Sequence, residues 1–243
     1  MKKLATMFIS MILVLSLLCA CGLTDKLNGT DTDGKKYQKY VKGLMDGSYK
    51  GDTNAYMSVC DADKTAAQKN YDDCMLYYVR SILYTFGFDD YTVLPTEVVD
   101  KYTEFTKKAV NEVKYTVDKG TKKDKKWYVT IHVSPMNIFT DKVVEEVKDY
   151  YTKFGEEYTE EKIADFSEDD YNEMVSTYLE ALLDILKDNF DDREYEEEVE
   201  KDIEIVIDGK TYGVEEEKWY EIDNLVMALG EADESSDAEE SDN

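Results

Sequence analysis

The alternation of apolar and polar residues from Trp127 to Val133 constrains the fold of this chain more than any other feature. Successive side chains of a strand point to opposite faces, so this pattern predicts a strand with one apolar face. A shorter alternation precedes it at Val113, Tyr115 and Val117, and the stretch between them, 118–126, is polar throughout. These segments therefore predict a β-hairpin.

A second hairpin is predicted near the end of the chain. Ile203, Ile205 and Ile207 alternate with polar residues and lead into Asp208-Gly209, a dipeptide typical of tight hairpin turns, before the chain returns over 211–214. Strands joined by tight turns are antiparallel. The two hairpins thus predict a curved antiparallel sheet of about four strands, covered on one face.

Apolar residues spaced by three and four positions predict about six helices around these hairpins. The predicted helices cover 37–45, 63–86, the stretch that begins at Pro95, 138–154, 167–186 and 220–229, with one more short turn at 54–59. Ser167 with Asp170 resembles a capping box at a helix start. Helices and hairpins in this order indicate the α+β class, in a single domain over 37–230.

The N-terminus has the pattern of an export signal. Two lysines follow Met1, and a largely apolar run of about 15 residues comes next, which is shorter than the roughly 20 needed for a membrane span. The run ends in Leu18-Cys19-Ala20-Cys21, which resembles the lipobox of bacterial lipoproteins, with Cys19 departing from the usual pattern. By this resemblance, residues 1–20 are a cleaved signal peptide and Cys21 is the lipidated residue. The alternative is an ordinary cleaved signal.

Lipidation of Cys21 would place the protein on the outer, extracytoplasmic face of the cell membrane. Two acyl chains give the stable anchoring that a single chain does not. Residues 21–36 are polar and turn-rich, and we expect them to form a lipidated tether. The membrane is the partner that this arrangement implies.

Acidic residues strongly outnumber basic ones, 55 against 29, for a formal net charge of −26. Because binding a phosphate backbone requires clustered Lys and Arg, this charge excludes nucleic acid as a partner. The last residues, 231–243, contain seven carboxylates and no basic residue, which predicts a disordered acidic tail.

Two stretches resemble a known family. YVKGLMDGSYKGD at 40–52 and WYVTIHVSPMNIF at 127–139 resemble the uncharacterised domain of lipoproteins from low-GC Gram-positive bacteria of the Firmicutes and clostridial type. The likeness covers most of the chain from 37 to 229, and its motifs are not catalytic. It implies an envelope lipoprotein and no particular reaction.

Cys60 and Cys74 are the cysteines that would remain after export, so a disulfide between them must be considered. If a helix begins near Lys64, Cys74 lies about 15 Å along it at 1.5 Å per residue, while Cys60 comes only four residues before its start. Disulfides need Cα atoms within roughly 7 Å. We therefore predict no bridge, and expect Cys74 to be a core residue.

No catalytic residue, metal site or cofactor is predicted. His132 is the sole histidine and lies on the polar side of its predicted strand, where it is more often structural or exposed than a ligand. Zinc motifs, the GxSxG elbow and phosphate-binding loops are absent from the sequence. Paired acids such as Glu156-Glu157 are expected from the composition alone.

The leading hypothesis is a non-enzymatic binding or interaction module of the cell envelope, with a small-molecule, glycan or protein partner. Tyr115 and Trp127 are the candidate ligand-face residues, although the simpler interpretation is that both fill the core beneath the helices. One alternative is an envelope-polymer hydrolase, which needs two carboxylates roughly 5 to 9.5 Å apart. Another is a folding factor that offers an apolar sheet face to clients.

Overall fold

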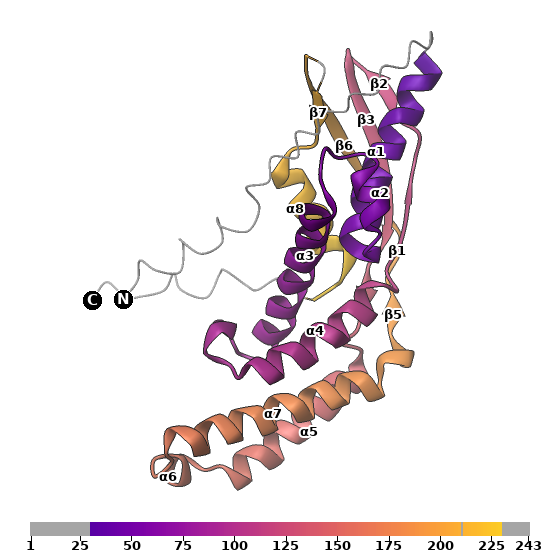
Figure 1. Cartoon of the computed structure of the whole chain (residues 1–243). Helices are drawn as coiled ribbons and strands as arrows, with labels where there is room; N and C mark the ends of the chain where they lie inside the picture. Colours follow the sequence, from indigo (N-terminus) through magenta and orange to yellow (C-terminus); the bar gives the residue numbers. More distant parts are fainter. Residues whose placement is uncertain (1–29, 210, 230–243) are drawn as a thin grey trace, which may run out of the picture.

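The computed structural model describes residues 30–209 and 211–229, and these form eight α-helices and an antiparallel sheet (Figure 1). The predicted α+β class, with helices packed on a curved antiparallel sheet, is confirmed. The expected signal peptide at 1–20, Cys21 and the expected tail at 231–243 lie outside the described residues.

Both predicted hairpins are present in the sheet. Its strands run in the order β1 (Lys114–Val117), β3 (Lys126–Ser134), β6 (Val199–Asp208) and β7 (Thr211–Gly213), all neighbours antiparallel. The central pair is β3 and β6, in which Trp127 lies opposite Ile205 and Val129 opposite Ile203. The predicted turn at 118–126 contains a further short strand, β2 (Thr121–Lys123), which pairs with the start of β3.

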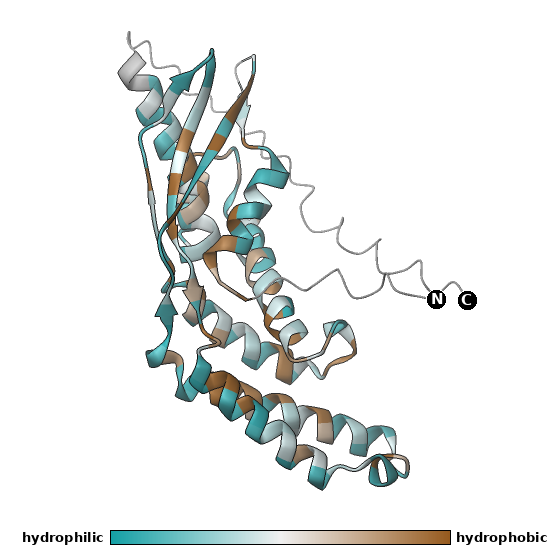
Figure 2. Cartoon of the chain, turned by 180° about the vertical axis from the view of Figure 1, so that it is seen from behind, coloured by the Kyte–Doolittle hydropathy of each residue, from teal (hydrophilic) through white to brown (hydrophobic). Residues whose placement is uncertain are grey.

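Helices cover one face of this sheet. They are α1 (Thr30–Lys50), α2 (Thr53–Met57), α3 (Lys64–Thr85) and α8 (Glu216–Val226). The strand residues beneath them are buried and form the core with the apolar sides of the helices: Trp127, Val129, Ile131, Val133, Ile203 and Ile205. Figure 2 shows the alternation of hydrophobic and hydrophilic residues along the strands, which gives the sheet its covered and its solvated face.

The remaining helices lie toward the other end of the molecule. They are α4 (Thr96–Val110), α5 (Asp141–Glu157), the single turn α6 (Glu160–Ile163) and α7 (Glu168–Asp188), with α5 and α7 side by side as a hairpin (Figure 1). The predicted capping box at the start of α7 is confirmed, with Ser167 and Asp170 bonded in both directions. A two-stranded ribbon of β4 (Met136–Asn137) and β5 (Glu194–Tyr195) lies where this hairpin meets the sheet. The 3-10 turns Tyr91–Val93 and Phe190–Asp192 complete the order.

Tyrosine fills much of the interior. Tyr40, Tyr49, Tyr78 and Tyr102 are among the largest fully buried side chains. A buried hydroxyl needs a hydrogen-bond partner. The Tyr102 hydroxyl donates to the Leu179 carbonyl at 2.8 Å and joins α4 to α7.

Two helices have limits that differ clearly from the predicted ones. Helix α1 begins at Thr30 and not at 37, so residues 30–36, which we expected in the tether 21–36, are helical. The Gly120 amide donates to the Gly34 carbonyl at 3.0 Å, and this tertiary contact outweighs the low helix propensity of the segment. Helix α8 begins four residues before the predicted start and ends at Val226.

Candidate ligand-binding site

An open, shallow cavity of about 450 Å³ lies between α1 and β1. Lys42, Asp46 and Lys50 line it from α1, because residues four positions apart share one face of a helix. Lys114 and Tyr115 line it from β1, and Thr116, Val113, Ser134 and Glu198 complete the wall. Its volume is within the usual range of roughly 300–1,000 Å³ for small-ligand sites.

Asp46 is fixed by two donors at the cavity wall. The Lys42 Nζ atom lies 2.7 Å from Asp46 Oδ1 and 2.5 Å from Oδ2, and the Tyr115 hydroxyl donates to Asp46 Oδ1 at 2.8 Å. Burial, followed by the neighbouring Asp46 carboxylate, raises the pKa of the Tyr115 hydroxyl well above its usual value. Tyr115 therefore remains a hydrogen-bond donor at any physiological pH.

Lys50 joins α1 to the end of α4. Its ammonium donates to the carbonyls of Asn111 at 2.6 Å and Val113 at 2.7 Å, which follow the last turn of that helix. A cation is favourable at a helix C-terminus. Burial nevertheless lowers the pKa of Lys50, because removing an ammonium from water disfavours its charged form.

The cavity is locally cationic although the chain is strongly acidic. Three lysines line it, against the carboxylates of Asp46 and Glu198. The third lysine, Lys114, has its Nζ atom 3.4 Å from the centre of the Tyr195 ring. This balance of charges suits an anionic group.

Only one of the two candidate ligand-face residues lines this cavity. Tyr115 does, whereas Trp127 is 6% exposed and packs against Tyr37 with ring centroids 5.2 Å apart. Tyr115 lies opposite Val133, six positions along β3 from Trp127, which is about 20 Å at roughly 3.3 Å per residue. The structure thus places the two residues on one sheet face but not in one site.

His132 lies on the solvated face of β3, as predicted. Its Nε2 atom is 3.1 Å from Asp118 Oδ2, and its Nδ1 atom is 3.3 Å from Glu198 and 3.7 Å from Glu200. The hydrogen bond to Asp118 raises the pKa of the imidazole above its usual value. Within 30–209 and 211–229, no group of three His, Cys, Asp or Glu residues is arranged to hold a metal ion.

Cys60 and Cys74 are both thiols in the structure. Cys60 is buried, and Cys74 lies in α3, partly buried against the core. Burial raises the pKa of the Cys74 thiol, followed by the effect of the Asp223 carboxyl.

Asp223 of α8 is the one carboxyl buried among the described residues. It accepts a hydrogen bond from the Tyr49 hydroxyl at 2.6 Å, and burial raises its pKa to about 7. Because a glycoside hydrolase of the kind considered above needs two carboxyl groups facing a substrate, this lone buried acid does not supply its catalytic pair.

Sequence reasoning missed most of this geometry. Lys42, Asp46 and Lys50 stand on α1 at helical spacing, but nothing local in the sequence shows that β1, more than sixty residues later, covers that face. Asp223 gives a weak signal, because its position falls between the apolar residues Ile222 and Leu225.

A search of solved structures found similarity to the crystal structure of a putative lipoprotein (ycdA) from Bacillus subtilis subsp. subtilis str. 168. The TM-score is 0.52 at 15% sequence identity, with 83% of this chain and 61% of that chain covered. The likeness is one of fold, and this chain spans less than two thirds of that protein's length. No protein-family model and no curated protein matches the chain.

In the part of the chain that the structure describes, no helix has the length and apolar character to cross a membrane.

Proposed function

We propose that this chain is a lipid-anchored lipoprotein on the outer face of the cell membrane, and that its folded part binds a small anionic ligand in the cavity between α1 and β1. The anchor is supported by the export signal and by the lipobox-like Leu18-Cys19-Ala20-Cys21. The similar fold of a protein described as a putative lipoprotein is consistent with it. Membership of the lipoprotein family that the sequence resembles is part of this proposal.

The lysines of the cavity carry the binding part of the proposal. Each lysine ammonium has three hydrogen-bond donors. Lys42 donates to the two carboxylate oxygens of Asp46, and Lys50 donates to the carbonyls of Asn111 and Val113. A carboxylate or phosphate in the cavity would accept the remaining donors. It would also stabilise the charged form of Lys50 and raise its lowered pKa. The ligand class is therefore a small molecule, glycan fragment or peptide with an anionic group, bound without chemical change.

Thermal unfolding of the lipidated protein in detergent tests the binding. The probes are inorganic phosphate and acetate, with sodium chloride at matched ionic strength and glucose as references. A probe at a hundred times its dissociation constant should stabilise the protein by about 2.7 kcal/mol. Equal shifts with sodium chloride would contradict the proposal.

A matched pair of variants locates the site. Lys42→Gln with Lys114→Gln should abolish the stabilisation by the anionic probe, because both ammonium groups line the cavity. Lys69→Gln is the control, since Lys69 forms the same i,i+4 pair with Asp73 on α3 that Lys42 forms with Asp46 on α1. An unchanged shift in the double variant would place the anion elsewhere.

The anchor is tested by two cysteine substitutions. Cys21→Ser should prevent incorporation of a labelled fatty acid and release the protein from the membrane fraction. Cys19→Ser is the control, because that residue would leave with the signal peptide and should not be needed. Labelling that survives in Cys21→Ser would reject Cys21 as the modified residue.

A further inference from the structure

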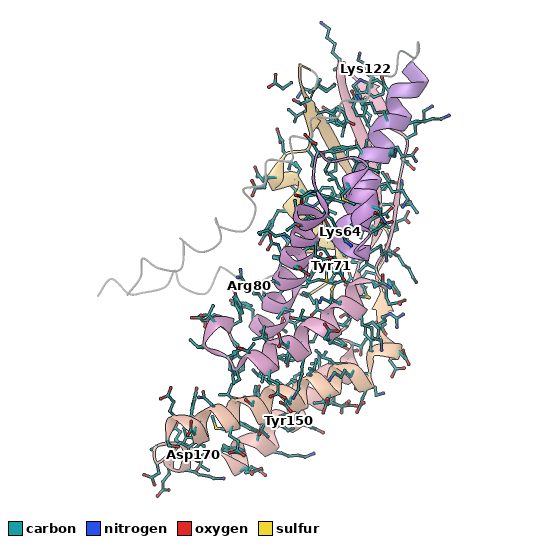
Figure 3. All side chains as sticks on the ribbon, viewed as in Figure 1. Lys64, Tyr71, Arg80, Lys122, Tyr150 and Asp170 are labelled. Carbon is teal, nitrogen blue, oxygen red and sulfur yellow. The ribbon has the colours of Figure 1, made fainter. Side chains whose placement is uncertain are left out.

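The end of the sheet where β2 turns into β3 concentrates lysine. The stretch 119–126 contains one acid, Asp124, and five basic residues, in a chain with 55 acids and 29 bases: Lys119, Lys122, Lys123, Lys125 and Lys126. The first turns of α1 lie beside it through the Gly120–Gly34 backbone hydrogen bond; they add Lys35, Lys36 and Lys39, and also the acids Asp31 and Asp33. We call this region the lysine-rich end; Lys122 marks it in Figure 3.

The lysines of the hairpin differ in whether a described acid pairs with them. Lys123 pairs with Asp202 at 2.9 Å and Lys126 with Glu204 at 2.8 Å across the sheet. Lys122 and Lys125 form no ion pair with any residue that the structure describes. Their charge is thus available to an external partner.

The turn that presents these lysines has an unusual backbone. Asp124 and Lys125 have positive φ angles of 49° and 72°, the conformation of a two-residue type I′ turn. Glycine or asparagine is usual at the second position, and a lysine in the left-handed region carries a conformational cost. A lysine is therefore held at the tip of the hairpin where glycine would fit with less strain.

Exposed aliphatic side chains lie next to the lysines. Val206 is 38% and Ile207 is 50% exposed near the end of β6. They line a shallow cavity of about 240 Å³ with Lys125 and with the Lys126–Glu204 ion pair, above the buried Trp127 and Ile205. Lysines beside exposed apolar side chains are typical of surfaces that sit in the headgroup region of a membrane.

The start of α1 lies at this same end (Figure 1). Nine positions separate Cys21 from Thr30, which span at most about 30 Å when fully extended. The α5–α7 hairpin, where Asp170 is labelled in Figure 3, lies at the opposite end of the molecule. A chain anchored through Cys21 would therefore hold the lysine-rich end nearest the bilayer.

We propose that the lysine-rich end docks on anionic phospholipid headgroups and orients the domain with the α5–α7 hairpin away from the membrane. This inference rests on the lipid anchor of the proposed function. The overall negative charge does not oppose it strongly, because charges beyond a Debye length of about 8 Å at physiological ionic strength are largely screened. Val206 and Ile207 favour a lipid surface over a soluble polyanion, which offers no apolar phase.

The test compares amine-reactive labelling of the lipidated full chain on phosphatidylcholine vesicles with and without phosphatidylglycerol. Mass spectrometry should find that phosphatidylglycerol lowers labelling of Lys122 and Lys125 several-fold, and that high salt restores it. Lys148 and Lys153, exposed on α5 at the opposite end, should label equally on both. Equal labelling of Lys122 and Lys125 on the two vesicles would overturn the proposal.

A second experiment reverses the charge of the two lysines. Lys122→Glu with Lys125→Glu should remove the phosphatidylglycerol-dependent protection of Lys39, whereas Lys148→Glu with Lys153→Glu makes the same change of charge and should leave it intact. Protection of Lys39 that persists in the first variant would reject the docking surface.

Two further outcomes separate the possible causes of failure. Soluble polyphosphate can be added to the chain on phosphatidylcholine vesicles. If it protects Lys122 and Lys125 from labelling as strongly as phosphatidylglycerol does, the surface binds a polyanionic polymer and the membrane is rejected as its partner. Flotation in a density gradient shows whether the chain is attached to the vesicles. A chain that floats with neither kind of vesicle lacks the anchor, and this outcome overturns the proposed function and the docking together. A chain that floats with both but shows no protection overturns the docking alone.

Discussion

The hydroxyl of Tyr49 donates a 2.6 Å hydrogen bond to Oδ1 of Asp223, a residue 174 positions further along the chain. Tyr49 is in α1 and Asp223 in α8, and the hydroxyl of Tyr78 in α3 donates to the Asp223 carbonyl at 2.8 Å. Three helices that cover the sheet are thus joined at one acidic residue. Because that carboxyl is buried and no cation among the described residues pairs with it, it makes the stability of the fold depend on pH.

We predict that Asp223 lowers the free energy of unfolding as the pH rises from about 4 to 7. Burial raises its pKa from 3.8 to about 7 in the folded chain. Between these values the unfolded chain releases the proton and the folded chain retains it, so the unfolded state gains stability. The full effect is on the order of 4 kcal/mol at 1.36 kcal/mol per pKa unit. Urea unfolding at a series of pH values measures it.

Asp223→Asn is the variant that isolates this effect. It removes the titrating group but retains an oxygen that can accept from Tyr49. The stability of the variant relative to the natural chain should therefore rise across that pH window and stay level above about pH 7. A difference that is independent of pH would show that Asp223 is already ionised in the fold.

We predict that His132 titrates above the usual imidazole pKa of 6.5. The hydrogen bond to Asp118 favours the protonated ring, and Glu198 and Glu200 add to it. The stability that this interaction contributes is present below pH 6.5 and is lost as the pH rises through the higher folded pKa. His132 is the sole histidine, so its ring protons can be followed by NMR without ambiguity.

Asp118→Asn tests the cause of that shift. Removal of the carboxylate should move the His132 pKa down toward its usual value, whereas Asp165→Asn, in the loop after α6, should leave it unchanged. An unaltered titration in Asp118→Asn would rule out Asp118 as the main cause.

Much of the fold could be predicted from the sequence because the apolar residues of its strands and helices recur at regular spacings. Val129, Ile131 and Val133 alternate strictly, and the apolar residues of α7 repeat every three to four positions, so local pattern and tertiary burial agree there. The first turns of α1 have no such pattern, since their helix depends on the contact between Gly34 and Gly120. A contact between distant segments leaves no periodic trace in either segment.

The candidate site was less predictable for the same reason. Tyr115 was selected for its strand position, but the bond to Asp46 that gives it a role depends on how α1 crosses the sheet. Trp127 was selected by the same argument, and its ring lies largely in the core. Periodicity identifies the buried face of an element and does not identify the helix that covers it.

We predict two thiols and no disulfide in the mature chain. Cys60 and Cys74 are both reduced in the structure, and the raised pKa of Cys74 disfavours its reactive thiolate. Thiol-specific alkylation should therefore be slow in the folded protein and should reach two thiols after unfolding without reductant. A Cys60–Cys74 cross-linked peptide in non-reduced mass spectrometry would contradict the prediction.

We predict opposite effects for alanine at two helical glycines. In α1, a Cβ atom at Gly47 would lie 2.7 Å from the Cβ of Tyr56, so Gly47→Ala should force α1 and α2 apart and destabilise the protein by about 1–3 kcal/mol. In α5, a Cβ at Gly155 would meet no atom of the described residues within 4 Å, and Gly155→Ala should stabilise by up to about 1 kcal/mol. Denaturant unfolding of both variants measures the two signs. Equal changes in the free energy of unfolding would show that helix propensity alone governs both positions. They would contradict the close contact between Gly47 of α1 and Tyr56 of α2.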